Sequence, residues 1–389
     1  MLDLSGMATE WNKELSRTPP GFVVAPFAGK RHRSFIIRNH LYFRASDGPV
    51  EVDEDGMSLS ENRTRFEQTI YRLAEEAHFP EENQSVSDAL APGATNGRLQ
   101  STRQEAFCSW VEEALEEIRK SRLTKVVLSR TEVAGLHPRF SPVDLFLRLS
   151  DAYTNAFVSL VWLPGVGLWL GATPELLLRV NNDELRTVSL AGTRSMPPEA
   201  DFSVKNWGEK ELVEQAIVSR YIRRCFETLG IRDFQEEGPE TVRIGNILHL
   251  QTSFRLKQAG GIANAADRLL WLLHPTPAVC GVPKAAAQAF IASKEAHDRA
   301  FYSGFLGPVN FSGESRLFVN LRCLQVVGDR AVIYAGAGIT AESQPAQEWL
   351  ETELKTHALL KYLRQVGYAQ RSRASASEVD PKVRALCDE

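Results

Sequence analysis

Hydrophobic positions along the chain follow two periods, which predict helices and strands in alternation. In residues 103–122 the apolar side chains recur three or four apart and acidic side chains fill the opposite face, as in an amphipathic helix. Residues 125–133, KVVLSRTEV, alternate with a period of two and predict a strand. The same two patterns predict helices at 62–79, 141–153 and 209–230, a helix, loop and helix at 264–293, and strands at 22–27, 34–43, 156–163, 167–180, 185–195 and 242–255.

The stretch from 316 to 338 predicts a β-hairpin. Two apolar runs, RLFVNLRCLQVV and RAVIYAGAG, meet at Gly328–Asp329, where a tight turn is favoured. Strict alternation along the first run places Arg322 on the same face as Phe318 and Asn320. Hairpin turns are too many, and helices too irregularly spaced, for a doubly wound parallel sheet, so the predicted fold class is α+β.

Composition limits the partners and the compartment. The 389 residues are 43% hydrophobic and 24% charged, as in globular proteins, and the formal net charge of -4 gives no reason to expect nucleic acid or an anionic membrane as partner. No apolar run approaches the roughly 18 residues that span a bilayer, and the N-terminus lacks the apolar core of a signal peptide. Five scattered cysteines without a CxxC pair indicate reduced thiols in a cytoplasmic protein.

A connector divides the chain. Residues 89–97, ALAPGATNG, are rich in glycine, proline and small side chains. We therefore expect residues 1–95 to form a less characteristic N-terminal part of the same fold and residues 96–366 to form the main domain. Residues 367–389 are polar and without pattern, which predicts a loose tail.

Two predicted helices each carry a pair of glutamates three residues apart. Glu211 and Glu214 form the first pair, and Glu348 and Glu351 form the second, so each pair leaves one face of its helix. Two such pairs can hold a hard divalent cation such as Mg²⁺. The alternative is ordinary surface charge, because acids are favoured in a first helical turn and Lys355 can pair with Glu351 one turn later.

Two strand ends offer backbone groups to a ligand. Gly336 and Gly338 follow Tyr334 at the end of the last predicted strand, and a glycine turn lets a ligand approach the backbone closely. Gly192 and Thr193 end the strand at 185–195, where their amides and the threonine hydroxyl can receive an anion.

Four further charged or titratable residues stand in predicted strands, each with two interpretations. Glu175, among apolar neighbours, is costly unless it is paired or functional. Lys125 begins a strand, where a lysine is usually solvated, and His249 lies mid-strand, where a satisfied core histidine is common. Arg322 is either an end-of-strand guanidinium or an anion clamp. The residues alone leave these alternatives open.

Ten short motifs occur together, in the order KVVLSR, GATPELLLR, SLAGT, KELVEQ, NILHLQT, HPTPAVCG, YSGFLGP, NLRC, YAGAGI and EWLETELK. The ordered set is specific although each motif alone is weak. Residues from about 100 to 365 therefore resemble the chorismate-utilising enzymes, which include isochorismate, anthranilate, aminodeoxychorismate and salicylate synthases. The resemblance implies one chorismate-binding catalytic domain, residues 96–366, with large antiparallel sheets packed as a sandwich and helices outside, and dependence on Mg²⁺.

The resemblance also implies a role for each candidate residue. Lys125 is similar to the general base that activates a water for attack on C2 of chorismate, and Glu175 to the general acid that protonates the departing C4 hydroxyl. The metal-binding acids are matched by Glu214 and Glu351, with Glu211 and Glu348 as their companions. Contacts with the substrate are implied for Gly192, Thr193, His249, Ala278, Arg322, Tyr334, Gly336, Gly338 and Lys355.

Two features favour isochorismate as the product. Lys125 stands where water-using members carry lysine, and Ala278 stands where aminating members and salicylate synthases commonly carry threonine or serine. No glutamine-amidotransferase region is visible, so we expect no such subunit, and the resemblance implies a monomer. HPTPAVCG is similar to siderophore-pathway enzymes, whereas YSGFLGP and SQPAQEW favour the menaquinone type. A salicylate synthase, which eliminates pyruvate, and a catalytically silent binding module are the alternatives.

Overall fold

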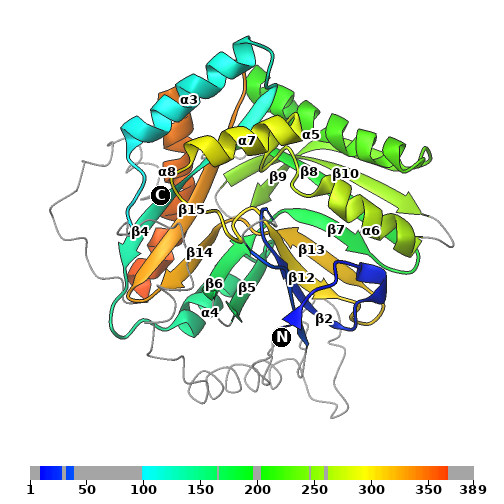
Figure 1. The fold of residues 1–389 in the computed structure, drawn as a ribbon, viewed down its shortest axis with the longest axis horizontal. Helices are drawn as coiled ribbons and strands as arrows, with labels where there is room; N and C mark the ends of the chain where they lie inside the picture. Colours follow the sequence, from blue (N-terminus) through cyan, green and yellow to red (C-terminus); the bar gives the residue numbers. More distant parts are fainter. Residues whose placement is uncertain are drawn as a thin grey trace.

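A computed structural model of the chain describes residues 9–28, 32–38, 99–163, 166–195, 203–244, 247–257 and 262–366. The predicted helix at 62–79, the connector at 89–97 and the tail at 367–389 lie outside these residues. Within them, the strands form two sheets, and the helices lie on the outside (Figure 1). The predicted α+β class, with antiparallel sheets packed as a sandwich, is confirmed.

Both sheets are antiparallel at every strand pair that the structure describes. The six-stranded sheet has the order β11 (Gly281–Val282), β4 (Lys125–Gly135), β15 (Arg330–Ile339), β14 (Cys323–Val327), β6 (Gly167–Thr173) and β5 (Phe157–Leu163). The nine-stranded sheet has the order β1 (Thr9–Glu10), β3 (Phe35–Arg38), β2 (Gly21–Ala25), β12 (Phe305–Val309), β13 (Ser315–Val319), β7 (Leu176–Val180), β8 (Glu184–Ser195), β10 (Ile247–Lys257) and β9 (Gln235–Ile244). The helices are η1 (Leu15–Arg17), α3 (Gln104–Arg119), α4 (Pro142–Ala152), η2 (Val204–Asn206), α5 (Glu209–Thr228), α6 (Ile262–Leu273), α7 (Lys284–Lys294) and α8 (Pro345–Gln365).

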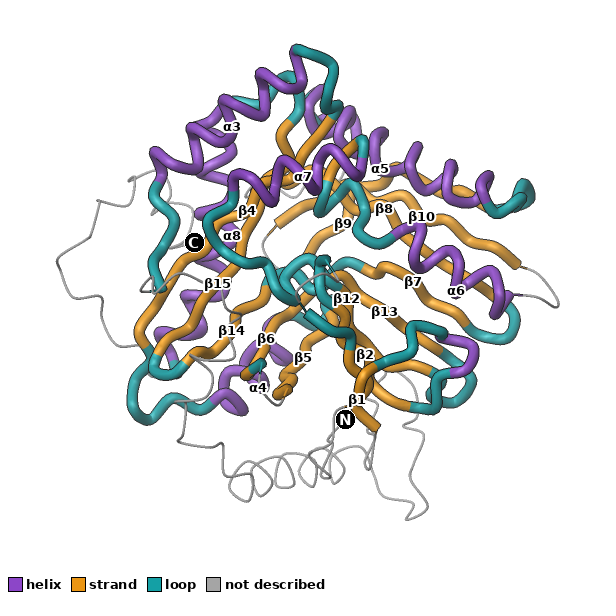
Figure 2. Tube along the Cα trace, viewed as in Figure 1, coloured by secondary structure: helices purple, strands orange, loops and turns teal. Residues whose placement is uncertain are grey.

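Aromatic side chains fill the space between the two sheets. Tyr334 of β15 stacks on Trp169 of β6 and on Tyr302, with ring centroids 5.5 and 5.3 Å apart. Phe22 of β2 and Leu306 of β12 close this core from the other sheet. Helices α5 and α6 cover the outer face of the nine-stranded sheet, and α4 and α8 cover the outer face of the six-stranded sheet (Figure 2). The period-two alternation of the strands thus separates an inner from an outer core.

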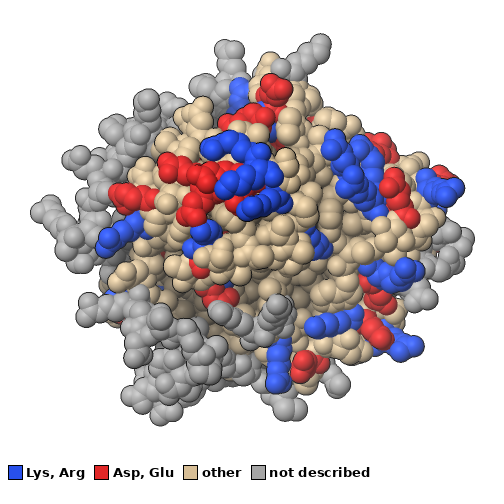
Figure 3. All heavy atoms as spheres, turned by 45° about the horizontal axis from the view of Figure 1, so that its top comes forward, with Lys and Arg blue, Asp and Glu red and all other residues tan. Residues whose placement is uncertain are grey.

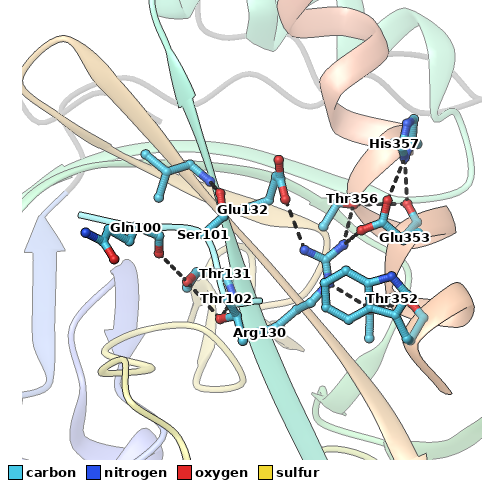
Figure 4. A network of polar contacts seen from close by, with 12 residues as sticks. Gln100, Ser101, Thr102, Arg130, Thr131, Glu132, Thr352, Glu353, Thr356 and His357 are labelled. Atoms are coloured by element: carbon cyan, nitrogen blue, oxygen red, sulfur yellow. Dashed lines mark hydrogen bonds and ion pairs between the residues drawn. The ribbon is translucent and has the colours of Figure 1, made fainter. Parts of the chain in front are cut away.

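One arginine on the outer face of β4 fastens helix α8 to the sheet. Arg130 is fully buried, and its guanidinium lies between Glu132 of β4 and Glu353 of α8 (Figure 4). It also donates hydrogen bonds to Thr352 and Thr356, at 2.7 and 3.2 Å. Each of the three guanidinium nitrogens therefore donates to an acceptor, as a charge out of contact with water requires.

Replacing Arg130 by methionine should lower the free energy of unfolding by about 3–5 kcal/mol, because the change leaves buried carboxylates without their cation. Urea denaturation followed by circular dichroism measures this loss. Arg179→Met is the matched control, since Arg179 pairs with Glu314 at a partly exposed site, where a loss below about 1 kcal/mol is expected. Equal losses in the two variants would show that the α8 attachment does not depend on Arg130.

The chain passes between the two sheets at two neighbouring points. Residues 167–180, predicted as one strand, are two: β6 ends at Thr173 in one sheet and β7 begins at Leu176 in the other. The return passage runs from β13 to β14. A backbone hydrogen bond from Val319 N to Glu175 O, 2.9 Å long, joins the two passages. The single-strand prediction is therefore wrong, and the break places Glu175 at the passage.

The second passage corrects the predicted orientation of Arg322. Alternation from Phe318 through Asn320 requires a continuous strand, but β13 ends at Val319 and β14 begins at Cys323. Arg322 lies between them with a φ of 47°, which breaks the period of two. The face assigned to Arg322 from the sequence is therefore wrong. The predicted hairpin at Gly328–Asp329 is confirmed by the pairing of β14 with β15.

Charges of both signs lie side by side on the face of the molecule seen in Figure 3. This mixture gives that face no extended field of one sign, in keeping with the small net charge of -4. Among the helices that the structure describes, none is both long and apolar enough to cross a membrane.

Candidate active site

Lys125 lies at the start of β4 and is fully buried. Its Nζ is 2.7 Å from Oε1 of Glu214, which belongs to the second turn of α5. The solvated strand end considered from the sequence is therefore excluded. Gly338 of β15 makes this approach possible, because a Cβ there would collide with Glu214 Oε1 and stand 3.0 Å from Lys125 Cε.

The two predicted glutamate pairs lie in the first two turns of α5 and α8, whose N-terminal parts are in contact. Lys210 of α5 joins them: its Nζ is 2.7 Å from Glu348 Oε1 and 3.9 Å from Glu351 Oε2. Lys355 Nζ lies 2.6 Å from Glu351 Oε1. Glu348 is 1% exposed, so the surface-charge interpretation fails for it. Glutamates from two distant segments thus share one network with lysines.

The pKa values of the two acids of α8, Glu348 and Glu351, are shifted in opposite directions. Burial and the nearby charge of Glu351 raise the pKa of Glu348 to about 7, against the attraction of Lys210. Burial also acts to raise the pKa of Glu351, but Lys355 and Lys210 outweigh it and hold that pKa below its ordinary value. Glu351 is therefore ionised at neutral pH. Glu348 loses its proton less readily, because a second negative charge beside Glu351 is unfavourable without a nearby cation.

Glu175 is buried at the passage between the sheets. Burial raises the pKa of its carboxyl to about 8, although Lys125 and Lys355 act in the opposite direction. Glu175 therefore carries a proton at neutral pH, as a general acid must. Because both lysine charges act on it, Glu175 belongs to the same site as Lys125 and the α8 acids.

His249 of β10 presents a free ring nitrogen to the site. Its Nδ1 lies 2.8 Å from Gly192 O, and because a carbonyl only accepts, Nδ1 donates the proton. Among the described residues, its buried Nε2 has no hydrogen-bond partner. Burial, together with the charge of Arg322, lowers the pKa of His249 to about 3. The ring is therefore neutral, with Nε2 available to accept a hydrogen bond.

The site lies at a free edge of β15. This strand pairs with β4 along its full length, but with β14 only from Arg330 to Ile333. No strand of the described chain covers its other edge beyond that point. Lys355 uses the edge by donating to Gly336 O at 2.8 Å. The passage from β13 to β14 leaves this edge open, because β14 begins only at Cys323, after Arg322.

A methyl group at position 338 should disturb the contact of Glu214 with Lys125, and so lower activity, without unfolding the protein. In Gly338→Ala the added Cβ displaces the Glu214 carboxylate, a flexible end that can move, and crowds Lys125. We expect kcat/KM with MgCl2 to fall about tenfold or more, with little change in melting temperature. Gly135→Ala is the matched control, because a Cβ at Gly135 of β4 meets nothing within 4 Å. Equal activity of the two variants would show that the site does not need the space that Gly338 leaves for Glu214 and Lys125.

The remaining predicted residues are placed as follows. Gly192 packs against α5, where a Cβ would stand 3.1 Å from Glu211 Cβ. The backbone of Thr193 belongs to β8, and its side chain lies outside the described part.

Ala278 is half-buried in the loop before β11, the strand that pairs with Lys125. Tyr334 is stacked between the sheets with its hydroxyl 3.3 Å from Gln325 Oε1, so that group is engaged within the fold. The proposed roles of these residues stay predictions.

The sequence did not lead us to predict Lys210 as a residue of the site, although its position in the first turn of a helix is an indication. A lysine in the first turn of a helix opposes the positive end of the helix dipole. Such a lysine is favoured when carboxylates from elsewhere surround it, as those of Glu348 and Glu351 do here.

The acids fit Mg²⁺ by chemistry, although lysines neutralise them in this structure. Carboxylate oxygens are the protein ligands that Mg²⁺ prefers. Both oxygens of Glu348 are buried without a well-aligned hydrogen bond, despite the short distance to Lys210. Among the described residues, no three histidine, cysteine, aspartate or glutamate side chains already converge as a metal site. A metal ion would hence need Glu214, Glu351 and their companions to release lysine contacts.

The family model described as "Chorismate binding enzyme" matches residues 56–364. The chain belongs to the chorismate-binding enzymes. Among curated relatives in this family, the "Salicylate biosynthesis isochorismate synthase" of Pseudomonas aeruginosa is 35% identical over 271 residues, which cover 66% of this chain and 54% of the relative. "Isochorismate synthase MenF" of Haemophilus influenzae is 32% identical over 264 residues, covering 66% of this chain and 60% of the relative. The chain thus matches little more than half the length of these chorismate-binding relatives.

Solved structures of the chorismate-binding enzymes have the same fold. The DhbC protein of Bacillus anthracis superposes with a TM-score of 0.67 at 24% identity, covering 90% of this chain and 85% of that one. The menaquinone-specific isochorismate synthase MenF of Escherichia coli superposes with a TM-score of 0.65 at 20% identity, covering 93% of both chains. At these identities the likeness establishes the fold alone.

Proposed function

We propose that this chain is an isochorismate synthase, which converts chorismate to isochorismate by adding water at C2 and removing the C4 hydroxyl. Relatives with that name support the proposal. The observation that carries it is the presence of a buried lysine and a buried, protonated acid in one site: the charge of Lys125 acts on Glu175, whose pKa is about 8. Exchange of hydroxyl groups across a ring needs one base and one acid.

Each of these two groups has one proton to move. Lys125, in its neutral form, accepts a proton from the attacking water, and the oxygen of that water bonds to C2. Glu175 donates its proton to the C4 oxygen as the C–O bond breaks, so that one water enters and one leaves while the double bond shifts. General acid–base help of this kind contributes about 10²–10⁴-fold for each group.

The remaining residues bind and orient the substrate. We assign Arg322, Lys355 and the free edge of β15 to the substrate carboxylates. His249 Nε2 is assigned to a hydroxyl of the ring. These groups lie in residues 96–366, which we propose as the catalytic domain.

Glu214 and Glu351, with Glu211 and Glu348 beside them, would hold Mg²⁺. When bound, this ion supplies positive charge that neutralises and orients the ring carboxylate next to Gly192 and Thr193. The chain's own contribution is to bring acids from α5 and α8 together, through the contacts of Lys210 with Glu348 and Glu351.

We propose menaquinone biosynthesis as the pathway and the cytoplasm as the compartment, with a monomer that needs no amidotransferase subunit. Relatives named for menaquinone-type and for siderophore-type enzymes both match the chain, so a siderophore pathway is the alternative. Ala278 disfavours pyruvate elimination, which a salicylate synthase performs.

The test is product analysis. Purified protein, chorismate and MgCl2 should give isochorismate as the main product on reversed-phase chromatography, and excess EDTA should abolish its formation. Salicylate and pyruvate as main products would show a salicylate synthase instead. Calorimetric binding of chorismate without any conversion would show a binding module.

A further inference from the structure

Lys210 has an unusual position for a helix-initiating lysine. It lies in the first turn of α5, between Glu209 and Glu211, and its side chain reaches across to α8. There its Nζ is 2.7 Å from Glu348 and 3.9 Å from Glu351, and the charge of Glu214 also acts on it. The ammonium therefore lies beside two of the acids that the proposed function assigns to Mg²⁺, and within the influence of a third.

Three lysines neutralise this acid cluster, and they differ in how firmly they are held. Lys125 is fully enclosed, and Lys355 is anchored by its hydrogen bond to Gly336 O as well as by Glu351. Lys210 is the most exposed of the three side chains at 20%, and within the described chain its polar contacts are the carboxylates alone. Its long side chain can swing into water without breaking a backbone contact.

We propose that Lys210 is a built-in counter-cation, which holds the α5 and α8 acids together before a metal ion binds and which the metal ion must displace. The inference rests on the proposed function, since that function supplies the Mg²⁺ site. Without Lys210 the buried Glu348 would face Glu351 with no cation between them, and like charges so close repel. An ammonium already among the oxygens also reduces the attraction that a divalent cation gains there. Lys210 thus stabilises the metal-free fold and weakens metal binding.

The test uses MgCl2 as the only ligand and needs no turnover. Lys210→Met keeps the length of the side chain and removes its charge. We expect isothermal calorimetry at constant ionic strength to give a Kd for Mg²⁺ about tenfold lower or more in this variant. In EDTA its melting temperature should lie below that of the wild type, and saturating MgCl2 should remove most of the difference.

Lys294→Met is the matched control, because Lys294 of α7 pairs with Glu113 of α3 away from the acids. It should leave the Kd for Mg²⁺ unchanged. If Lys210→Met does not fold, Lys210→Gln serves for the same measurements. Unchanged or weaker Mg²⁺ binding by the charge-removed variant, or a melting difference that MgCl2 does not reduce, would overturn the proposal. If the wild type does not convert chorismate, the proposed function is wrong, but the Mg²⁺ binding measurements on Lys210→Met still test this proposal.

Discussion

Replacing Lys125 by glutamine should reduce kcat for isochorismate formation by about 10²–10⁴-fold. The amide can still donate a hydrogen bond to Glu214, whose carboxylate lies 2.7 Å from the lysine Nζ, but it cannot accept a proton from water. The loss should fall on kcat more than on KM, because the missing group acts on the attacking water. Initial rates of isochorismate formation, measured by chromatography over a range of chorismate concentrations, give both constants.

Two controls separate a chemical from a structural effect of this change. Lys120→Gln removes a lysine whose partners, Glu116 and Glu117, lie on the exposed face of α3, so it should leave kcat unchanged. Circular dichroism melts of Lys125→Gln should show a folded protein. If folded Lys125→Gln retains activity within a few-fold of wild type, Lys125 is not the base.

Glu175→Gln should cause a comparable loss in kcat, about 10²–10⁴-fold, for the opposite reason. The amide fits the buried site without a charge, and it cannot give a proton to the departing C4 hydroxyl. Since the native carboxyl is itself neutral at pH 7, the change should leave the stability nearly as it was. Rates from the same chromatographic assay and thermal melts measure the two effects.

The pH profile of the wild type distinguishes this role from a structural one. Burial raises the pKa of Glu175 to about 8, so the acid form persists up to that pH and is lost as the pH rises through it. For the free enzyme, kcat/KM should therefore fall about tenfold per pH unit above about pH 8. This alkaline limb should be absent from the residual activity of Glu175→Gln. An unchanged limb in the variant would assign it to another group.

Much of the site could be predicted because its residues sit in locally decided elements. Alternation in β4 placed Lys125 on the same face as Val127 and Ser129, and in the structure this face is turned inward. Spacing three apart put both acids of α8 on one helix face, a property of any helix. Glu175 was singled out because an acid in an apolar run has to be neutralised or paired.

Contacts between elements distant in the chain could not be predicted from the sequence. The break of residues 167–180 into β6 and β7 depends on two sheets packing over each other, which a hydrophobic run does not encode. The same packing turns Arg322 out of the strand pattern, with a φ of 47°. The ion pair of Lys210 with Glu348 joins helices far apart in the chain, so only their docking reveals it.

By itself, the sequence determined the α+β class, most helices and strands, the paired acids and the family resemblance, because periodicity and motif order are local properties of the chain. Only the tertiary structure decided that the outer edge of β15 is open at Gly336, that both acid helices meet there, and that lysines neutralise them. These depend on where two sheets exchange strands and on burial. Burial sets the charge of Glu175 and His249, and no local pattern fixes it.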